Sequence, residues 1–144
     1  MPSKRTLIKT LLAGLMLAAL PAFADAPPEG MVDLHYHRPD GAYEKWGLHA
    51  WKRAPGASDQ PLDGVGWFNP LPPTGKDDFG VYWRLSIKDF GSTATVNYII
   101  HKGDSKEQKG KDMAFDTKEY KEAWVISGDA NIYKSKEEAL AAVK

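Results

Sequence analysis

Two ring-bearing side chains, His49 and Trp51, lie two residues apart in the segment WGLHAW (46–51), where Leu48 and Ala50 alternate with them. Side chains of a strand alternate between its two faces, so a core position for Leu48 and Ala50 places His49 and Trp51 on the outer face. A flat indole displayed beside an imidazole suits stacking on the apolar C–H face of a sugar ring. The alternative is a core position for Trp51, since tryptophans are highly buried on average.

His35 and His37 are the other histidine pair with a spacing that could support chemistry, and Asp33 is expected on the same face of their strand. A zinc site needs three or four ligands, commonly including cysteine or carboxylate groups, and the sequence has no cysteine. We therefore expect no metal site, no cofactor and no catalytic residue here. The two imidazoles are instead expected to make hydrogen bonds between the strand and neighbouring loops.

Alternating apolar and polar residues, separated by turn residues such as Pro39-Asp40-Gly41, predict the elements that position these side chains. The expected strands cover residues 31–38, 46–53, 80–88, 94–102, 113–115, 122–126 and 131–133, with a short strand near Trp67. Trp46 and Trp83 are expected in the core. Ser135 and Glu138 form a capping box at the start of a short C-terminal helix, residues 135–144. The fold class is all-β, a single antiparallel β-sandwich of immunoglobulin-like type with that helix.

The opening pattern HYHRPDG–Y–WGLH–W (35–51) resembles the start of the pullulanase-associated starch-binding module, carbohydrate-binding module family 41. Further matching segments are DDFG (77–80), IHKGD (100–104), KD (111–112) and WVISGD (124–129). They occur in the family's order and spacing from about residue 31 to residue 134. Each segment alone is weak evidence, whereas the set is specific.

This resemblance implies an α-glucan ligand and a set of carbohydrate-binding residues. Family members stack two rings of this strand on consecutive glucose units, which implies this role for His49 and Trp51. A lysine and an aspartate near the following loop bind hydroxyl groups; Asp112 matches the aspartate, while Lys102 and Lys106 compete for the lysine position. Some members carry another tryptophan in that loop, where this sequence has DSK (104–106). The charged composition of the loop, taken alone, is typical of a solvated loop.

The N-terminal residues have the features of a targeting segment. A basic start precedes the apolar run 11–20 and Ala22-Phe23-Ala24, which predicts a signal peptide at 1–24, a flexible leader at 25–30 and the module at 31–144. The alternative for the first segment is an uncleaved anchor. We expect secretion to the periplasm or the medium, with no membrane association after cleavage. Three of the 19 basic residues and none of the 19 acidic residues precede Asp25, leaving 16 basic and 19 acidic residues, a net charge of −3. That charge argues against nucleic acid as a partner.

The favoured function is a non-catalytic α-glucan-binding module, and two other functions compete with it. The chain could be a shortened pullulanase-type glycoside hydrolase, or a secreted interaction domain that shares only the fold. A glycosidase needs two carboxylates that flank a cleft and a scaffold to hold them, and too few residues follow the module for a catalytic barrel. The expected partners are an α-glucan and, as a candidate, a separate pullulanase or amylase.

Overall fold

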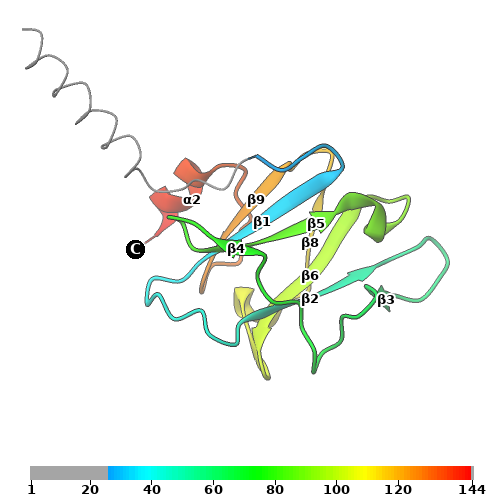
Figure 1. Cartoon of the computed structure of the whole chain (residues 1–144), viewed down its shortest axis with the longest axis horizontal. Coiled ribbons are helices and arrows are strands. Elements are labelled where there is room, and N and C mark those ends of the chain that lie inside the picture. Colours follow the sequence, from blue (N-terminus) through cyan, green and yellow to red (C-terminus); the bar gives the residue numbers. More distant parts are fainter. Residues whose placement is uncertain (1–25, 144) are drawn as a thin grey trace, which may run out of the picture.

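The computed structural model describes residues 26–143, which form two β-sheets and three short helical segments (Figure 1). The strands are β1 (Met31–His37), β2 (Gly47–Lys52), β3 (Gln60–Pro61), β4 (Gly75–Lys76), β5 (Val81–Ser86), β6 (Thr95–Lys102), β7 (Ser105–Lys106), β8 (Met113–Asp116) and β9 (Glu122–Ile126). The helical segments are the 3₁₀ turns η1 (Ile87–Phe90) and η2 (Gln108–Gly110) and the α-helix α2 (Lys136–Ala142).

One sheet has the order β4-β5-β1-β9, and the other has the order β3-β2-β6-β7 with β8 also paired to β6. All neighbouring strands are antiparallel except β1 and β9, which run parallel. The predicted β-sandwich with a short C-terminal helix is therefore confirmed, with one parallel pair added.

The core lies between the inner faces of the two sheets. Val32, Leu34 and Tyr36 of β1 and Leu48 and Ala50 of β2 are fully buried there. These are the alternate residues that strand periodicity assigns to one face.

The two tryptophans expected in the core differ in depth. Trp83 is fully buried, as predicted, and its Nε1 donates a hydrogen bond to the carbonyl oxygen of Leu71 at 2.8 Å. Trp46 packs on the edge of the core and is only partly buried, with the Arg38 guanidinium 4.4 Å above its ring.

β1 and β2 follow each other in the sequence but lie in different sheets, since the chain crosses between the layers after the turn in which Gly41 N donates a hydrogen bond to Arg38 O. Some local expectations were wrong. Residues 66–69 form a tight turn and no strand, and residues 131–133 contribute only a single bridge between Tyr133 and Trp124. The two-residue strands β3, β4 and β7 were missed, because such short strands carry no periodicity.

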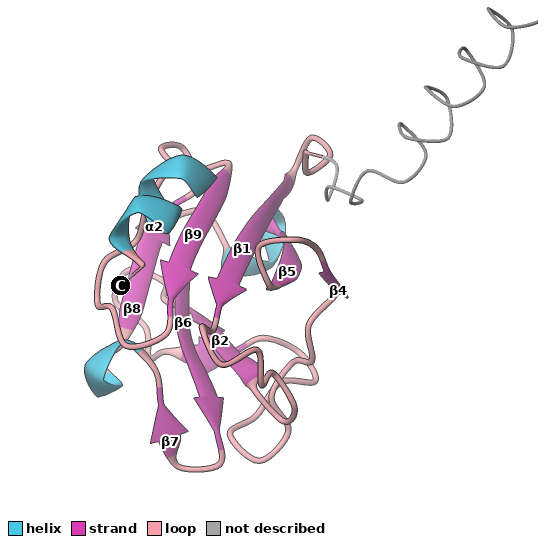
Figure 2. Ribbon diagram, turned by 90° about the vertical axis from the view of Figure 1, so that its left-hand side faces the viewer, coloured by secondary structure: helices cyan, strands magenta, loops and turns pink. Residues whose placement is uncertain are grey.

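Helix α2 lies beside β9 on the outer side of the first sheet (Figure 2). Ser135 is its N-cap, and the Ser135 side chain accepts a hydrogen bond from the backbone N–H of Glu138 at 3.1 Å, as the capping box predicts. Buried Ala139 packs with Phe79 and Ile126. The predicted signal peptide lies outside the described residues. Within residues 26–143, no helix is long and apolar enough to span a bilayer.

Candidate functional site

The outer face of the β2–β6 pair carries the residues singled out from the sequence. His49 lies opposite Ile99 and Trp51 lies opposite Asn97 in the antiparallel register, so all four side chains share one face. A shallow hollow of about 320 Å³ opens on this face. Its lining consists of rings, two carboxylates and apolar side chains: His49, Trp51, Asp59, Pro61, Trp67, Ile99 and Asp112.

Trp51 lies on the predicted face but is not displayed as expected. Its side chain stays outside the main core cluster, as alternation with Leu48 and Ala50 requires, yet only 6% of it is exposed. Strand β3 pairs with β2 at Trp51 through Pro61, which also lines the hollow. Trp51 therefore forms part of the floor of the hollow. The more exposed ring of the predicted pair is His49, which is half-buried, with its centroid 5.6 Å from that of Trp51.

A third ring at the hollow, Trp67, was missed as a site residue. Its indole lies parallel to the imidazole of His101, with centroids 3.7 Å apart and planes 2° from parallel. It also meets His49 edge to face at 5.6 Å. The indole Nε1 donates a long hydrogen bond, 3.4 Å, to Asp104 Oδ1. Some family members carry a tryptophan in the loop at residues 104–106. In this chain, Asp104 of that loop instead accepts a hydrogen bond from Trp67, which lies in a different loop.

Backbone hydrogen bonds at both ends bring the Trp67 loop onto β2. Leu62 N donates to Ala50 O at 3.0 Å, and Leu48 and Leu71 exchange two hydrogen bonds of 2.8 and 2.9 Å. Gly47 permits this close approach, because a Cβ atom there would lie 2.8 Å from the Pro70 ring. A long loop rich in Pro and Gly is in this way fixed over the sheet.

Of the two candidate lysines, Lys106 lies on the same face as the hollow. Lys106 pairs with His101, whose side chain is on that face, and its Nζ is 5.3 Å from the centroid of the Trp67 ring. Lys102 pairs with Ser105, one residue out of phase, so its side chain leaves the opposite face of β6. The structure brings His49, Trp51, Lys106 and Asp112 together and leaves Lys102 apart.

The loop that carries Lys106 and leads to Asp112 is fixed by two buried polar side chains. The Tyr36 hydroxyl donates a short hydrogen bond to Glu107, and the Tyr98 hydroxyl donates to Gln108 Oε1 at 2.8 Å. Burial and then the Glu107 hydrogen bond raise the pKa of Tyr36 well above its usual value, so the phenol stays a donor. The lysine-rich loop is therefore anchored to the core at Glu107 and Gln108, while its lysines remain exposed.

Two ionisable groups at the hollow have shifted pKa values. Burial, followed by repulsion from His101, lowers the pKa of His49, while Asp112 acts in the opposite direction. His49 is accordingly a neutral imidazole at neutral pH. Arg53 donates bidentate hydrogen bonds of 2.7 Å to the two carboxylate oxygens of Asp59. They lower the pKa of Asp59 and keep it ionised.

A larger hollow of about 660 Å³ lies elsewhere, between residues 126–133 and α2. Tyr133 is the one aromatic ring in its lining, and the Tyr133 hydroxyl donates to Asp129 at 2.6 Å. Size alone would favour this hollow. The density of rings favours the smaller one as a place where a flat ligand could stack.

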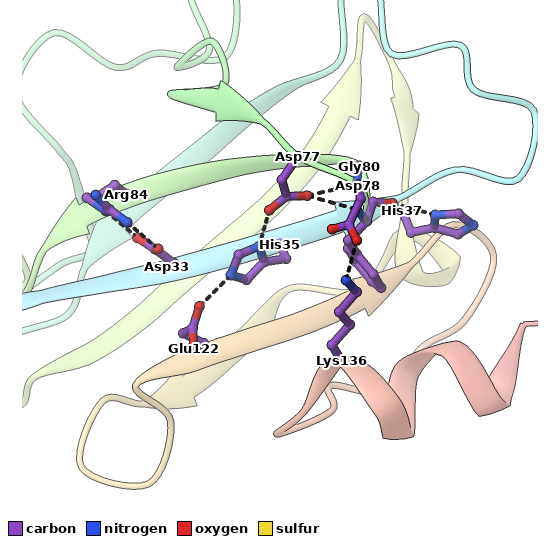
Figure 3. A network of polar contacts seen from close by, with 10 residues as sticks. Asp33, His35, His37, Asp77, Asp78, Gly80, Arg84, Glu122 and Lys136 are labelled. Carbon is purple, nitrogen blue, oxygen red and sulfur yellow. Dashed lines mark hydrogen bonds and ion pairs between the residues drawn. The ribbon is translucent and has the colours of Figure 1, made fainter. Parts of the chain in front are cut away.

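The histidines of β1 lie on the other sheet, in a polar cluster shown in Figure 3. His35 Nε2 is 2.9 Å from Glu122 Oε1, and the His37 ring is 2.6 Å from the carbonyl oxygen of Phe79. Asp33, His35 and Glu122 are close enough together to hold a cation. However, Arg84 donates to both oxygens of Asp33 at 2.8 Å, so a guanidinium already neutralises that carboxylate. His37 bonds a loop as expected, and His35 lies between the loop carboxylate of Asp77, 3.5 Å from its Nδ1, and Glu122 of the neighbouring strand.

A family model described as the bacterial pullanase-associated domain matches residues 30–134. The chain belongs to this family. The resemblance to the pullulanase-associated module, carbohydrate-binding module family 41, is thereby confirmed. The matched range contains β1 to β9 and so includes every residue of the hollow.

Relatives of this pullanase-associated domain include parts of longer proteins. An α-amylase of Streptomyces lividans is 39% identical over 74 residues, which is 51% of this chain and 7% of the amylase. A Klebsiella pneumoniae pullulanase complexed with maltotriose superimposes with a TM-score of 0.67 at 22% identity, covering 86% of this chain and 12% of the pullulanase. The chain spans 12% or less of the length of these two relatives.

The same fold occurs in a structure described as α-glucan recognition by family 41 carbohydrate-binding modules from streptococcal virulence factors. It superimposes with a TM-score of 0.60 at 22% identity, over 77% of this chain and 50% of that one. At this identity the likeness shows the fold alone.

Proposed function

We propose that this domain is a secreted, non-catalytic module that binds α-glucans such as pullulan, amylopectin, glycogen and maltooligosaccharides. One observation carries the proposal: a hollow with three rings, from His49, Trp51 and Trp67, bordered by Asp112 and Lys106, in a chain that belongs to the pullanase-associated family. The solved relatives described with maltotriose and with α-glucan support the ligand class.

The arrangement suits a neutral, flat and hydroxyl-rich ligand. The rings of His49 and Trp67 meet nearly at a right angle and so form two walls above the Trp51 floor, against which the apolar face of a pyranose can pack. The Asp112 carboxylate can accept hydrogen bonds from sugar hydroxyl groups, and the Lys106 ammonium can donate hydrogen bonds to them. Stacking contributes affinity for any glucose unit, and the two polar groups select the hydroxyl pattern.

One carboxylate of the hollow is unsuited to act as the acid of a glycoside hydrolase. Asp59 and Asp112 both line the hollow, but a glycosidase needs one carboxylic acid that is protonated near neutral pH. Arg53 lowers the pKa of Asp59, the reverse of what that acid requires. The proposed role is attachment without bond cleavage.

The related segments in an α-amylase and a pullulanase support an enzyme as the partner that this attachment serves. A separate pullulanase or amylase acting on the same polysaccharide is one arrangement. Secretion, to the periplasm or the medium, is part of the proposal, because residues 1–24 have the pattern of a signal peptide.

Affinity electrophoresis tests the proposal. The purified protein should be retarded in gels that contain pullulan or glycogen, with dissociation constants on the order of micromolar to millimolar, and should not be retarded by a β-linked glucan. No reducing sugar should be released from pullulan or starch. Unchanged mobility in every α-glucan gel would reject the binding function, and turnover abolished by Asp112→Asn would reject its non-catalytic character.

A further inference from the structure

The tip of the Trp67 loop is a tight turn that presents two adjacent aromatic residues. Gly66 and Asn69 exchange backbone hydrogen bonds of 3.2 and 3.0 Å, which leaves Trp67 and Phe68 as the two central residues. The Asn69 side-chain amide also donates to Gly64 O at 3.0 Å. The turn is therefore held in shape although it projects from the sheet.

The two rings have opposite environments. Trp67 is folded onto His101, whereas the Phe68 side chain is 98% exposed. In the described part of the chain, the other large hydrophobic side chain that is clearly exposed is Leu140, at 44%. Phe68 thus contributes nothing to the packing of the domain, and its ring is free to contact a ligand.

We propose that Phe68 forms an additional glucose-contacting subsite beyond Trp67, which makes the domain bind longer α-glucans more tightly than short ones. This inference rests on the proposed function. Trp67 links the two places, because its ring lines the hollow while its neighbour in the turn stands in solvent. A glucan that fills the hollow and continues past Trp67 would cover the Phe68 ring.

The surroundings of Phe68 favour a sugar over a protein as its ligand. Protein interfaces use contiguous apolar patches of a few hundred Å². Phe68 is instead an isolated ring next to exposed Asn69, and its turn is tied through Trp67 to the carboxylate of Asp104. A single ring among polar groups is the arrangement that stacks on a pyranose. Because the turn is already ordered, little conformational freedom is lost on binding.

Calorimetric titration with maltose, maltotriose and maltohexaose tests the subsite in the wild type, Phe68→Ala, Phe68→Tyr and Leu140→Ala. Phe68→Ala should weaken maltohexaose binding about tenfold and leave maltose binding unchanged, judging by aromatic stacking on other flat ligands. Phe68→Tyr should retain the wild-type affinities because it keeps the ring. Leu140→Ala, a matched loss of an exposed apolar side chain on α2, should change nothing.

All four proteins should melt at the same temperature, since neither substituted side chain is buried. If Phe68→Ala binds maltohexaose as the wild type does, the subsite is wrong and the proposed function stands. An equal loss for every length of sugar would also overturn the inference, because it would place Phe68 in the primary site. If the wild type binds none of the three sugars, the proposed function itself fails.

Discussion

The indole of Trp67 lies flat on the imidazole of His101, at 3.7 Å between ring centroids, and a second pair of the same geometry exists on the other sheet. There His35 and Trp124 stack at 3.7 Å with planes 5° from parallel. Both histidines are almost fully buried, at 1% exposed each. The first pair borders the hollow lined by His49, Trp51 and Trp67, which is the proposed binding site, and the second pair lies in the polar cluster of β1.

Trp67→Ala and Trp124→Ala should therefore differ in binding. Each removes one stacked ring, so each should lower the free energy of unfolding by about 0.5–1.5 kcal/mol from ring stacking, plus the contribution of buried area. Only Trp67→Ala should weaken maltotetraose binding, by about tenfold or more. Urea denaturation and calorimetry measure the two quantities. A loss of affinity in Trp124→Ala equal to that in Trp67→Ala would place the site elsewhere.

Trp51→Ala should reduce stability as well as affinity. Because only 6% of the indole is exposed, truncation should cost about 3–5 kcal/mol of folding free energy, as for a core aromatic residue. Trp51→Phe keeps a ring at the floor of the hollow and should recover most of that stability. Melting temperatures and gel retardation on pullulan distinguish the cases. A Trp51→Ala variant with wild-type stability would contradict the burial described for this ring.

Lys106→Ala and Lys102→Ala form a matched pair, since both side chains are exposed and lie four residues apart. Lys106→Ala should weaken maltotetraose binding about three- to tenfold, because it removes one hydrogen bond to a hydroxyl group. Lys102→Ala should leave affinity unchanged, since its side chain leaves the other face of β6. Both variants should stay within about 0.5 kcal/mol of wild-type stability. An affinity loss confined to Lys102→Ala would reverse the assignment.

His49 should make the domain less stable in mild acid. Its pKa is lowered in the folded state, chiefly by burial, so the unfolded chain binds the proton more readily. As the pH falls below the ordinary histidine value of about 6.5, the unfolded state gains this proton first and stability declines until the folded imidazole is also protonated. His49→Gln should lose less stability than the wild type between pH 7.5 and pH 5. Urea denaturation at the two pH values measures this, and identical losses would show that His49 does not titrate abnormally.

The sequence was sufficient for the sandwich and for the choice of sheet face. Strict alternation in β2, β5 and β6 placed Leu48, Trp83 and Tyr98 inward, and the Ser135 cap marked the start of α2. These features depend on residues close together in the chain, so the periodicity of apolar residues and the capping residues can be recognised in the sequence.

The sequence was insufficient wherever distant segments meet. Alternation assigns Trp51 to a face but cannot show that β3 and the Trp67 loop cover it. Trp67 itself lies in a turn without periodicity, and its contact with His101 joins residues 34 positions apart. One signal was available: two adjacent aromatic residues, Trp67 and Phe68, in a loop rich in Pro and Gly have no strand to fill, which indicates a role outside the core.

The five indole N–H resonances provide the most direct measurement of whether the hollow lined by His49, Trp51 and Trp67 binds α-glucan. In ¹H–¹⁵N spectra of the protein titrated with maltotetraose, the signals of Trp51 and Trp67 should shift together and saturate. The signals of Trp46, at the edge of the core, and of Trp124, beside His35, should stay in place. Saturable shifts at Trp124 without shifts at Trp51 and Trp67, or no shifts at tens of millimolar sugar, would contradict the proposed site.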